Sequence, residues 1–268
     1  MTDDALSFLA DSPVRSRVLG ALQSLGPARP SELRDELEVS RATVHRNLAA
    51  LGDRGWVRQD DDGYHATTAG LLVHERFEEF RDDIETVDRF ERLLEAIPAA
   101  GVPPIEVLAT ADLVTAARDQ PHAPVMRYVE ELTASDTDLV RGVSPVRSEM
   151  FDFGHEQLLD AGVETELLLP VDVLETERGD AGEGLDQTLA LDEFTLYVLE
   201  DDPGYGLTVT ADTAFVGGYG PDNQLVALAY SKHDAFVDWA SDAFDSLRST
   251  ASYVSKERAE ADDSVRLE

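Results

Sequence analysis

Residues 30–70 read PSELRDELEVSRATVHRNLAALGDRGWVRQDDDGYHATTAG, and this stretch decides the fold of the first part of the chain. It predicts one helix over residues 30–39 and a second over residues 41–54. Ser40 has the short polar side chain typical of a helix N-cap, and Gly55 is typical of a residue that ends a helix. The apolar positions of the second helix recur every three or four residues, which places them on one buried face: Val44, Leu48 and Leu51.

The flanking sequence extends this pattern in both directions. Before it, Ser12-Pro13 opens a helix that Gly26-Pro27 ends. After it, residues 56–59 and 64–67 alternate as strands, and Asp60-Asp61-Asp62-Gly63 between them is typical of a hairpin turn. Three helices with a tight middle turn and then a β-hairpin form the layout of a winged helix-turn-helix.

The stretch resembles the DNA-binding domain of prokaryotic winged-helix transcriptional regulators. The specific part of the resemblance is S-x-x-T-V-x-R-x-L-x-x-L-x-x-x-G-W-V, from Ser40 to Val57. The resemblance implies that the partner is double-stranded DNA and that the helix over residues 41–54 enters the major groove.

Charge supports this expectation locally. The chain has 22 basic and 55 acidic residues, a net charge of −33, which excludes a generally basic nucleic-acid coat and disfavours anionic membranes. Residues 40–58 depart from this acidity with a net charge of +3, because four arginines accompany Asp53 as the one acidic residue. A short basic island in an acidic chain indicates contact with a polyanion.

We expect the DNA contacts to come from this island. Arg46 has the side chain for a bidentate contact to guanine, whereas Arg54 and Arg58 are expected to hold the phosphate backbone. For Arg41 and Arg46 the alternative is a solvated pair facing Glu36 or Glu38, and His45 could instead cap or pack locally. The predicted contact residues are Ser40, Arg41, Ala42, Thr43, His45, Arg46, Arg54 and Arg58.

The predicted wing departs from the family pattern. Wings that enter the minor groove usually carry Arg or Lys at the tip, whereas this tip is Asp60-Asp61-Asp62. Phosphates repel carboxylates, so we expect the wing not to penetrate the groove. It could flank the groove through Arg58, Tyr64 or His65, or bind little at all.

The overall composition places the chain in a particular class of proteins. Two lysines accompany twenty arginines, and a large acidic excess with almost no lysine resembles the proteins of extreme halophiles; an acidic mesophilic protein is the alternative. The chain has no cysteine, which excludes disulfides and thiolate-ligated metals. The start of the sequence is unlike a signal peptide, and no segment is apolar enough to span a bilayer, so we expect a cytoplasmic protein.

A long helix is expected between residues 71 and 97. Its apolar positions follow near-heptad spacing for about three heptads, and charged residues lie between them. The apolar positions are Val73, Phe77, Phe80, Ile84, Val87 and Leu94. This spacing favours an antiparallel or parallel homodimer. The alternative is a helix that packs on the C-terminal part of its own chain.

The rest of the chain reads as alternating strands and helices. Strands are expected over residues 105–110, 139–143, 164–169, 193–199, 206–210, 213–218 and 224–230. Helices are expected from the region of Pro121 and Pro124 to residue 130, over 149–161 and over 233–253, with a loop over 177–184. This mixture indicates a mixed-sheet α/β domain.

This second part resembles the effector domain of archaeal winged-helix regulators, the type named for the middle domain of a methanogenesis regulator. The resemblance lies in Val143-Ser144-Pro145, residues 164–170 and Phe215-Val216-Gly217-Gly218-Tyr219. It implies a phospholipase D-like half that senses a small molecule or mediates assembly. The candidate ligand residues are Ser144, Arg147, Tyr219, Tyr230 and Lys232, although an ion pair with Glu149 is the simpler role for Arg147.

We therefore predict an α+β protein with a winged helix-turn-helix domain (1–68), a linker or dimerisation helix (69–100), an effector domain (101–256) and an acidic tail (257–268). Neither the phospholipase His-x-Lys motif nor a nucleophile elbow, P-loop or zinc motif occurs, so no enzyme, metal or cofactor is expected. Two alternatives stay open: an enzyme docked through its winged domain, and a winged-helix protein-interaction module.

Overall fold

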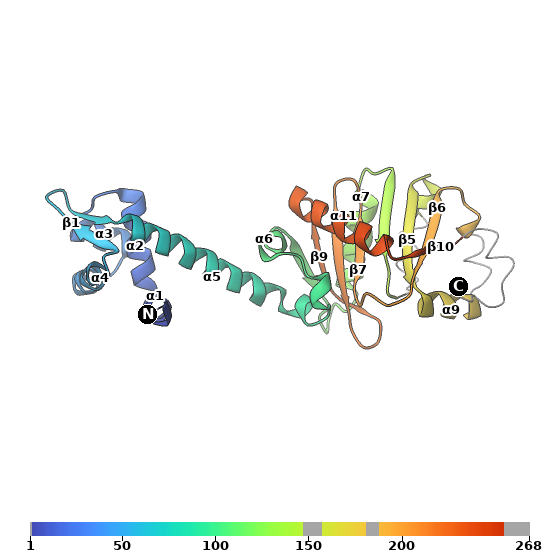
Figure 1. The fold of residues 1–268 in the computed structure, drawn as a ribbon, viewed down its shortest axis with the longest axis horizontal. Coiled ribbons are helices and arrows are strands. Elements are labelled where there is room, and N and C mark those ends of the chain that lie inside the picture. Colours follow the sequence, from blue (N-terminus) through green and yellow to red (C-terminus); the bar gives the residue numbers. More distant parts are fainter. Residues whose placement is uncertain (1, 147–156, 181–187, 255–268) are drawn as a thin grey trace. The chain divides into compact units, whose positions relative to one another are not determined.

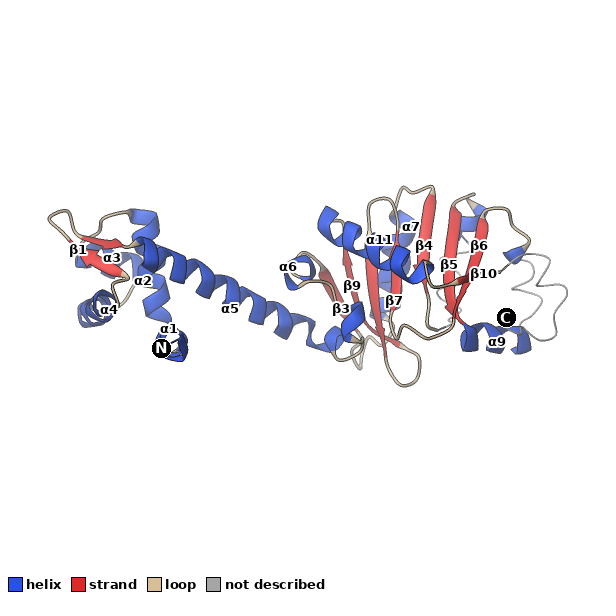
Figure 2. Ribbon diagram, viewed as in Figure 1, coloured by secondary structure: helices blue, strands red, loops and turns tan. Residues whose placement is uncertain are grey.

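The computed structural model describes residues 2–146, 157–180 and 188–254 (Figure 1). The chain divides into two compact units, residues 1–85 and 86–268, and each is described by itself. Helices dominate the first unit and a large β-sheet dominates the second (Figure 2).

From residue 13 onward, the N-terminal unit has the predicted order of helices and strands. A tight segment joins α3 to α4, and the antiparallel hairpin pairs Val57 with Ala66. At the hairpin turn, the backbone N–H of Asp60 donates to the carbonyl of Gly63 over 2.9 Å. This is the winged helix-turn-helix arrangement. The elements are α1 (Thr2–Ala10), α2 (Pro13–Leu25), α3 (Pro30–Leu37), α4 (Arg41–Asp53), β1 (Val57–Gln59), β2 (Tyr64–Ala66) and the first part of α5 (Thr68–Leu94).

One hydrophobic core holds this unit together. It includes the predicted stripe of α4 and apolar residues from α1, α2, α3 and β1, and each such side chain contributes roughly 1.5–3 kcal/mol when fully buried. Helix α1 was not predicted, although Leu9 anchors it in the core at 2% exposure. The core side chains are Leu9, Val18, Leu19, Leu22, Ala28, Leu33, Leu37, Val44, Leu48, Leu51, Trp56 and Val57.

The start of α5 is fixed to the wing by close backbone contact. The hydroxyl of Thr67 donates to the carbonyl of Gly55 over 2.8 Å. A Cβ atom at Gly70 would lie 2.1 Å from the carbonyl oxygen of Trp56, so only glycine fits there. One turn later the His74 ring lies over Gly20 of α2. The first part of α5 therefore packs as a fixed element of this unit.

The C-terminal unit is built on an eight-stranded mixed sheet in the order β10-β6-β5-β4-β7-β8-β9-β3. Strands β4, β5 and β6 are parallel, and every other neighbouring pair is antiparallel. The elements after α5 are η1 (Ala99–Gly101), α6 (Ile105–Leu108), β3 (Asp112–Thr115), α7 (Ala123–Ala134), β4 (Leu139–Val143), β5 (Glu164–Pro170), α9 (Val171–Asp180), β6 (Phe194–Leu199), β7 (Gly206–Val209), β8 (Ala214–Tyr219), β9 (Leu225–Ser231), α11 (Asp234–Arg248) and β10 (Ser252–Tyr253).

The two faces of this sheet carry separate cores. Alternate residues of a strand point to opposite faces, and on β8 Val216 packs with Phe236 of α11 and Phe90 of α5. The neighbouring Phe215 packs instead with Tyr128 of α7. The end of α5 and α11 therefore cover one face, and α7 covers the other (Figure 2).

Two predictions were wrong: the strand over residues 105–110 and the end of the last helix at residue 253. A neighbouring proline determines the structure of the first segment, and strand pairing determines that of the second. Residues 105–110 are not a strand: α6 begins directly after Pro104, whose carbonyl accepts the N–H of Leu108 over 2.8 Å. The strand lies further on, at β3, which pairs with β9. Helix α11 ends at Arg248 rather than at residue 253, because Ser252 and Tyr253 pair with β6 as β10.

The prediction of a loop over residues 177–184 was wrong for its first half, which is helical. Residues 177–180 continue α9, and the remainder lies outside the described residues. Most of the helix expected over residues 149–161 also lies outside them, and residues 157–160 are helical.

Candidate nucleic-acid interface and effector site

Helix α4 has one buried and one exposed face. Val44, Leu48 and Leu51 are at most 2% exposed, whereas the opposite face carries four of the residues predicted to contact DNA. The Nε of Arg41 donates to Nε2 of His45 over 3.4 Å, a long contact between neighbouring turns. The exposed face of α4 consists of Arg41, Ala42, His45, Arg46 and Ala49; we call it the α4 face.

Ser40 and Thr43 order the beginning of α4. The Ser40 hydroxyl accepts the backbone N–H of Thr43 over 3.1 Å, which is the predicted N-cap. The two hydroxyls also lie 2.9 Å apart in a hydrogen bond. One turn further, the buried Asn47 donates from Nδ2 to the Thr43 carbonyl over 2.8 Å. These contacts fix the orientation of the α4 face.

Arg46 is presented differently from Arg54. Arg46 is exposed, and within the described residues no hydrogen bond or ion pair holds its guanidinium. The Arg54 guanidinium instead lies 4.1 Å from the ring centroid of Phe8 and 5.5 Å from that of Trp56. Arg15 stacks on Phe8 as well, at 4.0 Å. Arg54 thus packs against α1 and the wing, a role that the sequence interpretation missed.

The wing combines an exposed arginine with an acidic tip. Arg58 on β1 is exposed and, among the described residues, forms no hydrogen bond or ion pair. Its register partner His65 lies with Nε2 2.6 Å from Oδ2 of Asp60. The His65 hydrogen bond lowers the pKa of Asp60. Asp61 and Asp62 are exposed, so the tip stays acidic apart from the Asp60–His65 pair.

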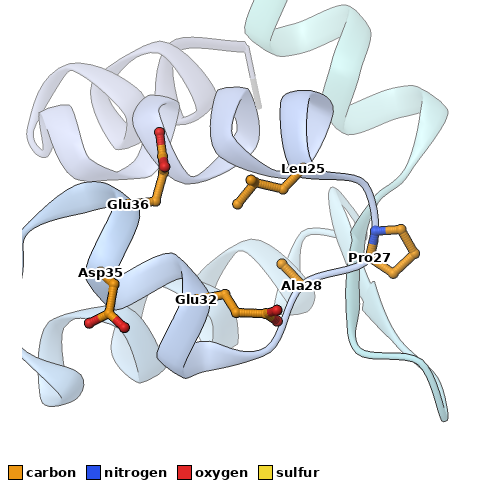
Figure 3. Close-up of a pocket in the computed structure, with 6 residues that line it drawn as sticks. All are labelled: Leu25, Pro27, Ala28, Glu32, Asp35 and Glu36. Atoms are coloured by element: carbon orange, nitrogen blue, oxygen red, sulfur yellow. The ribbon is translucent and has the colours of Figure 1, made fainter.

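A pocket lies between the end of α2 and α3 (Figure 3), and none of the residues that line it belongs to α4. Three carboxylates line it together with apolar atoms of Leu25, Pro27 and Ala28. One of them, Glu32, accepts the backbone N–H of Arg29 over 2.6 Å and so stabilises the start of α3. Glu32, Asp35 and Glu36 make this side of the unit repulsive to phosphate, so the α4 face is the more favourable side for DNA.

The candidate ligand residues of the second unit do not gather at one place. The register of β4, β7 and β8 brings Ser144 and Tyr219 to the same end of the sheet. The Tyr219 hydroxyl lies over Gly206, where a Cβ would be 2.7 Å away, and burial raises its pKa well above the ordinary value. The Ser144 hydroxyl donates to the carbonyl of Val146.

Tyr230 and Lys232 lie toward the opposite end of the sheet, where Ser231 pairs with Ala214. The Tyr230 ring stacks on Phe215 with centroids 6.3 Å apart, and burial raises the pKa of its hydroxyl. Arg147 lies outside the described residues. The described candidate residues therefore lie at two opposite ends of the sheet and do not form a single site.

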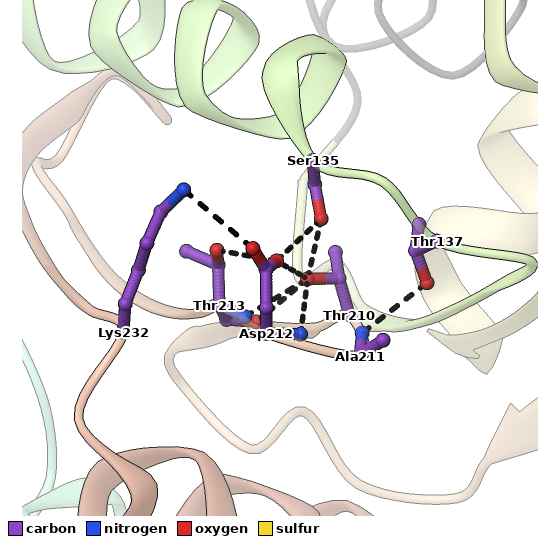
Figure 4. A network of polar contacts seen from close by, with 7 residues as sticks. All are labelled: Ser135, Thr137, Thr210, Ala211, Asp212, Thr213 and Lys232. Atoms are coloured by element: carbon purple, nitrogen blue, oxygen red, sulfur yellow. Dashed lines mark hydrogen bonds and ion pairs between the residues drawn. The ribbon is translucent and has the colours of Figure 1, made fainter.

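Lys232 belongs to a polar network that ties three segments together (Figure 4). Its Nζ lies 3.6 Å from Oδ2 of Asp212, in the turn between β7 and β8. Oδ1 of Asp212 accepts hydroxyl hydrogen bonds from Ser135 at 2.6 Å, Thr213 at 2.8 Å and Thr210 at 3.2 Å. These contacts join the end of α7 to the β7–β8 turn, so the network has a structural role.

Asp212 makes the stability of this unit depend on pH. The Ser135 hydrogen bond is the main reason that the pKa of Asp212 is lowered from 3.8. A lowered pKa in the folded state stabilises the fold above pH 3.8, and this stabilisation disappears as the pH falls through the lowered value. Because the side chain is 48% exposed, Asp212→Asn should destabilise the unit at pH 7 by only about 0.5–1.5 kcal/mol.

The measurement is urea unfolding at pH 7 and at pH 3, followed by the fluorescence of Trp239 in a Trp56→Phe background. We expect the difference between the wild type and Asp212→Asn to shrink at pH 3. Asp238→Asn, an exposed carboxyl on α11, is the control and should have little effect at either pH. An equal loss of stability in Asp212→Asn at both pH values would contradict stabilisation by the ionised Asp212 carboxylate.

The residues that the structure describes lack two other kinds of feature. No group of three or more His, Cys, Asp or Glu side chains is placed to hold a metal ion among them. In the same residues, no helix combines the length and apolarity that crossing a membrane requires.

The comparisons with protein families identify both parts of the chain. Residues 3–89 match the family model of the HVO_A0261 N-terminal domain, and residues 121–250 match that of the middle domain of the methanogenesis regulatory protein FilR1. The resemblance to an archaeal regulator with a methanogenesis-regulator domain is therefore confirmed. No curated protein matches the chain.

Several solved structures are similar to this one. TrmBL2, described as an archaeal chromatin protein with a novel mode of DNA binding, is 15% identical over 95% of this chain and 100% of its own, with a TM-score of 0.43. NucT from Helicobacter pylori is 8% identical over 54% of this chain and 98% of its own, with a TM-score of 0.44. An IclR transcriptional regulator from Alicyclobacillus acidocaldarius is 12% identical over 88% of this chain and 94% of its own, with a TM-score of 0.22.

Proposed function

We propose that this chain, which joins an HVO_A0261-type N-terminal domain to a FilR1-type middle domain, is a sequence-specific DNA-binding transcriptional regulator. The observation that carries the proposal is the α4 face, which presents Arg41, His45 and Arg46 on a helix whose other face is fully packed. A packed helix with exposed arginines in its N-terminal half suits insertion into the major groove.

The contacts divide by chemistry. Arg46 is proposed to read a guanine through a bidentate hydrogen bond. Arg41 and Arg58 are proposed to contact phosphates, which position the domain without reading sequence. Arg54 is left out of the proposed interface because its guanidinium stacks on Phe8 and Trp56. Ser40 and Thr43 cap the helix, and Ala42 and His45 lie on its exposed side, where they would contact base edges.

In this proposal, residues 1–68 bind DNA, residues 69–100 link the domains, and residues 101–256 form the effector domain. Residues 255–268, which include the predicted acidic tail, lie outside the described residues. The effector domain is proposed to bind a small molecule or mediate assembly, without being an enzyme. Ser144 and Tyr219 mark the end of the sheet where such a ligand would be sought, because ligands of α/β sheets bind beyond the carboxyl ends of parallel strands.

The proposal is tested by selecting bound duplexes from a random DNA library with the full-length protein. We expect enrichment of a short motif that contains guanine, at salt concentrations up to molar potassium chloride. Molar salt matters because the acidic surface is proposed to be an adaptation to it, since the Debye length falls to about 3 Å at 1 M and screens self-repulsion. Failure to enrich any motif at both low and high salt would contradict the proposed function.

The acidic wing tip is expected to weaken DNA binding. Asp61 and Asp62 are exposed, so the double variant Asp61→Asn/Asp62→Asn removes repulsion between the tip and nearby phosphates. Affinity for the selected duplex should rise several-fold, on the order of 3- to 10-fold, near 0.1 M salt and approach the wild-type value at molar salt. Fluorescence anisotropy titrations at several salt concentrations measure this effect.

The matched control is Asp35→Asn/Glu36→Gln, which removes the same charge from the acidic pocket on α3. It should change affinity less than the wing variant at every salt concentration. An equal gain in affinity from both variants would mean that only the net charge of the domain affects binding. It would contradict the proposed position of the wing tip near the phosphates.

A further inference from the structure

One face of the wing brings together three side chains that can pair in two ways. Residues two apart on a strand share a face, so Arg58 and Asp60 point to the same side of the hairpin. His65 joins them there because it is the register partner of Arg58. The carboxylate of Asp60 contacts His65, with Oδ2 2.6 Å from Nε2. Arg58 is exposed and, in the described part of the chain, has no ion pair or hydrogen bond.

This pairing is not the one that charge alone favours. A guanidinium is always charged and has five N–H donors that suit a carboxylate, whereas a histidine ring is neutral for part of the range between pH 5 and 8. His65 has the advantage of position. Its side chain is 18% exposed, so its freedom is already restricted, whereas Arg58 would lose much rotamer entropy on pairing. Asp60 therefore lies between two competing partners.

We propose that His65 is a positioning residue of the DNA interface: by holding the carboxylate of Asp60, it leaves the guanidinium of Arg58 available for a phosphate. The inference rests on the proposed function and names a residue that this function needs without contact to DNA. Arg58 is the one arginine or lysine in residues 57–66. If the contact with His65 is lost, Asp60 pairs with Arg58 and neutralises it.

The surroundings of the His65 ring contain few other charges. Among the described residues, Asp60 is the one charged side chain in ion-pair contact with the ring. The opposite face of β2 packs on the apolar core. The charged side chains of α2, which contributes to that core, are Arg15 and Arg17, and both donate to backbone carbonyls elsewhere. The other charged groups of the hairpin are exposed: Arg58, Asp61 and Asp62.

The contact between Asp60 and His65 is expected to depend on pH. A protonated ring makes a charge-assisted hydrogen bond with the carboxylate, so the contact is strongest at low pH. It weakens as the ring loses its proton between pH 5 and 8, and Asp60 then pairs with Arg58 more often. The contribution of His65 to DNA affinity should therefore fall as the pH rises.

The test is a pair of compensating variants of the full-length protein, with affinity for the selected duplex measured by fluorescence anisotropy. At pH 6 and about 0.1 M salt, His65→Gln should weaken binding on the order of 3- to 10-fold. The slope of log affinity against log salt should fall by about 1, because one phosphate contact is lost. Adding Asp60→Asn should restore most of the affinity, since no carboxylate is left beside Arg58.

The matched control for the second change is Asp61→Asn, which removes the same charge from the same turn. In the described residues Asp61 has no ion pair with His65, so in the His65→Gln background it should restore affinity much less than Asp60→Asn does. Equal recovery from both changes would assign the effect to net charge and overturn the proposal. A loss that neither change recovers would give His65 a direct or a folding role and overturn it as well.

Two further readouts isolate the contact. Without DNA, the Nε–H signal of Arg58 in NMR spectra should shift in His65→Gln and return in His65→Gln/Asp60→Asn; an unchanged signal would overturn the proposal. The ratio of wild-type to His65→Gln affinity should fall between pH 6 and pH 8, and a constant ratio would contradict the expected pH dependence. A protein that binds no duplex would overturn the proposed function and this inference with it. A protein that binds DNA without the compensation would overturn this inference alone.

Discussion

Replacing Arg46 with alanine is expected to weaken binding to the selected duplex about 5- to 150-fold while leaving the melting temperature unchanged. A bidentate arginine–guanine contact is worth about 1–3 kcal/mol, or roughly 5- to 150-fold in affinity. The fold should not change, because Arg46 is exposed and, in the described part of the chain, no ion pair or hydrogen bond holds its side chain.

The control for this variant is Arg34→Ala. Arg34 is an exposed arginine of the same unit, but it lies on α3 and pairs with Asp35 at 2.6 Å. Its loss changes the net charge equally and should weaken binding much less. An Arg46→Ala protein that loses stability together with affinity would be a folding variant, and equal losses from both variants would assign the effect to net charge.

Replacing Gly70 with alanine is expected to destabilise the N-terminal unit by about 3 kcal/mol or more. The added Cβ would lie 2.1 Å from the carbonyl oxygen of Trp56. This obstacle is backbone, so no side-chain rotation relieves the contact, and α5 must move away from the wing. Because α5 also packs against α2 at Ser16, which donates to Glu78 over 2.7 Å, the displacement should disturb the core of the unit.

Gly52→Ala is the matched control within α4. There the new Cβ would lie 3.8 Å from the nearest atom, the carbonyl oxygen of Val57, which is an ordinary contact. Replacing a helical glycine without a clash stabilises a helix by about 0.5–1 kcal/mol, so this variant should gain stability. Urea unfolding followed by Trp56 fluorescence in a Trp239→Phe background reads the N-terminal unit alone. Similar losses of stability in Gly70→Ala and Gly52→Ala would contradict the close approach of the Trp56 carbonyl to Gly70.

Local patterns were sufficient to predict the N-terminal unit from residue 13 onward. The spacing of Val44, Leu48 and Leu51 fixed the buried face of α4, and the Ser40 cap and the turn before Gly63 depend on neighbouring residues alone. The role of Arg54 could not be predicted in this way. Its stacking partner Phe8 lies on α1, and a contact between residues so far apart in sequence leaves no periodic signal.

The second unit shows where sequence reasoning fails. The segment after Pro104 has the composition of a strand, but the proline begins a turn of helix, and the strand pairing with β9 occurs later, at β3. The candidate ligand residues were chosen by residue type and position in the chain. Strand register then separated Ser144 from Lys232, and register is a property of tertiary pairing rather than of composition.

The claim that Arg46 reads a guanine is tested most directly by a double-mutant cycle across the interface. Each guanine of the selected motif is replaced in turn by 7-deazaguanine, which lacks the N7 acceptor, and affinities are measured for wild type and Arg46→Ala. The account predicts a guanine of the motif whose replacement weakens the wild type about tenfold and has no further effect on Arg46→Ala. Equal losses in both proteins at every guanine would contradict it.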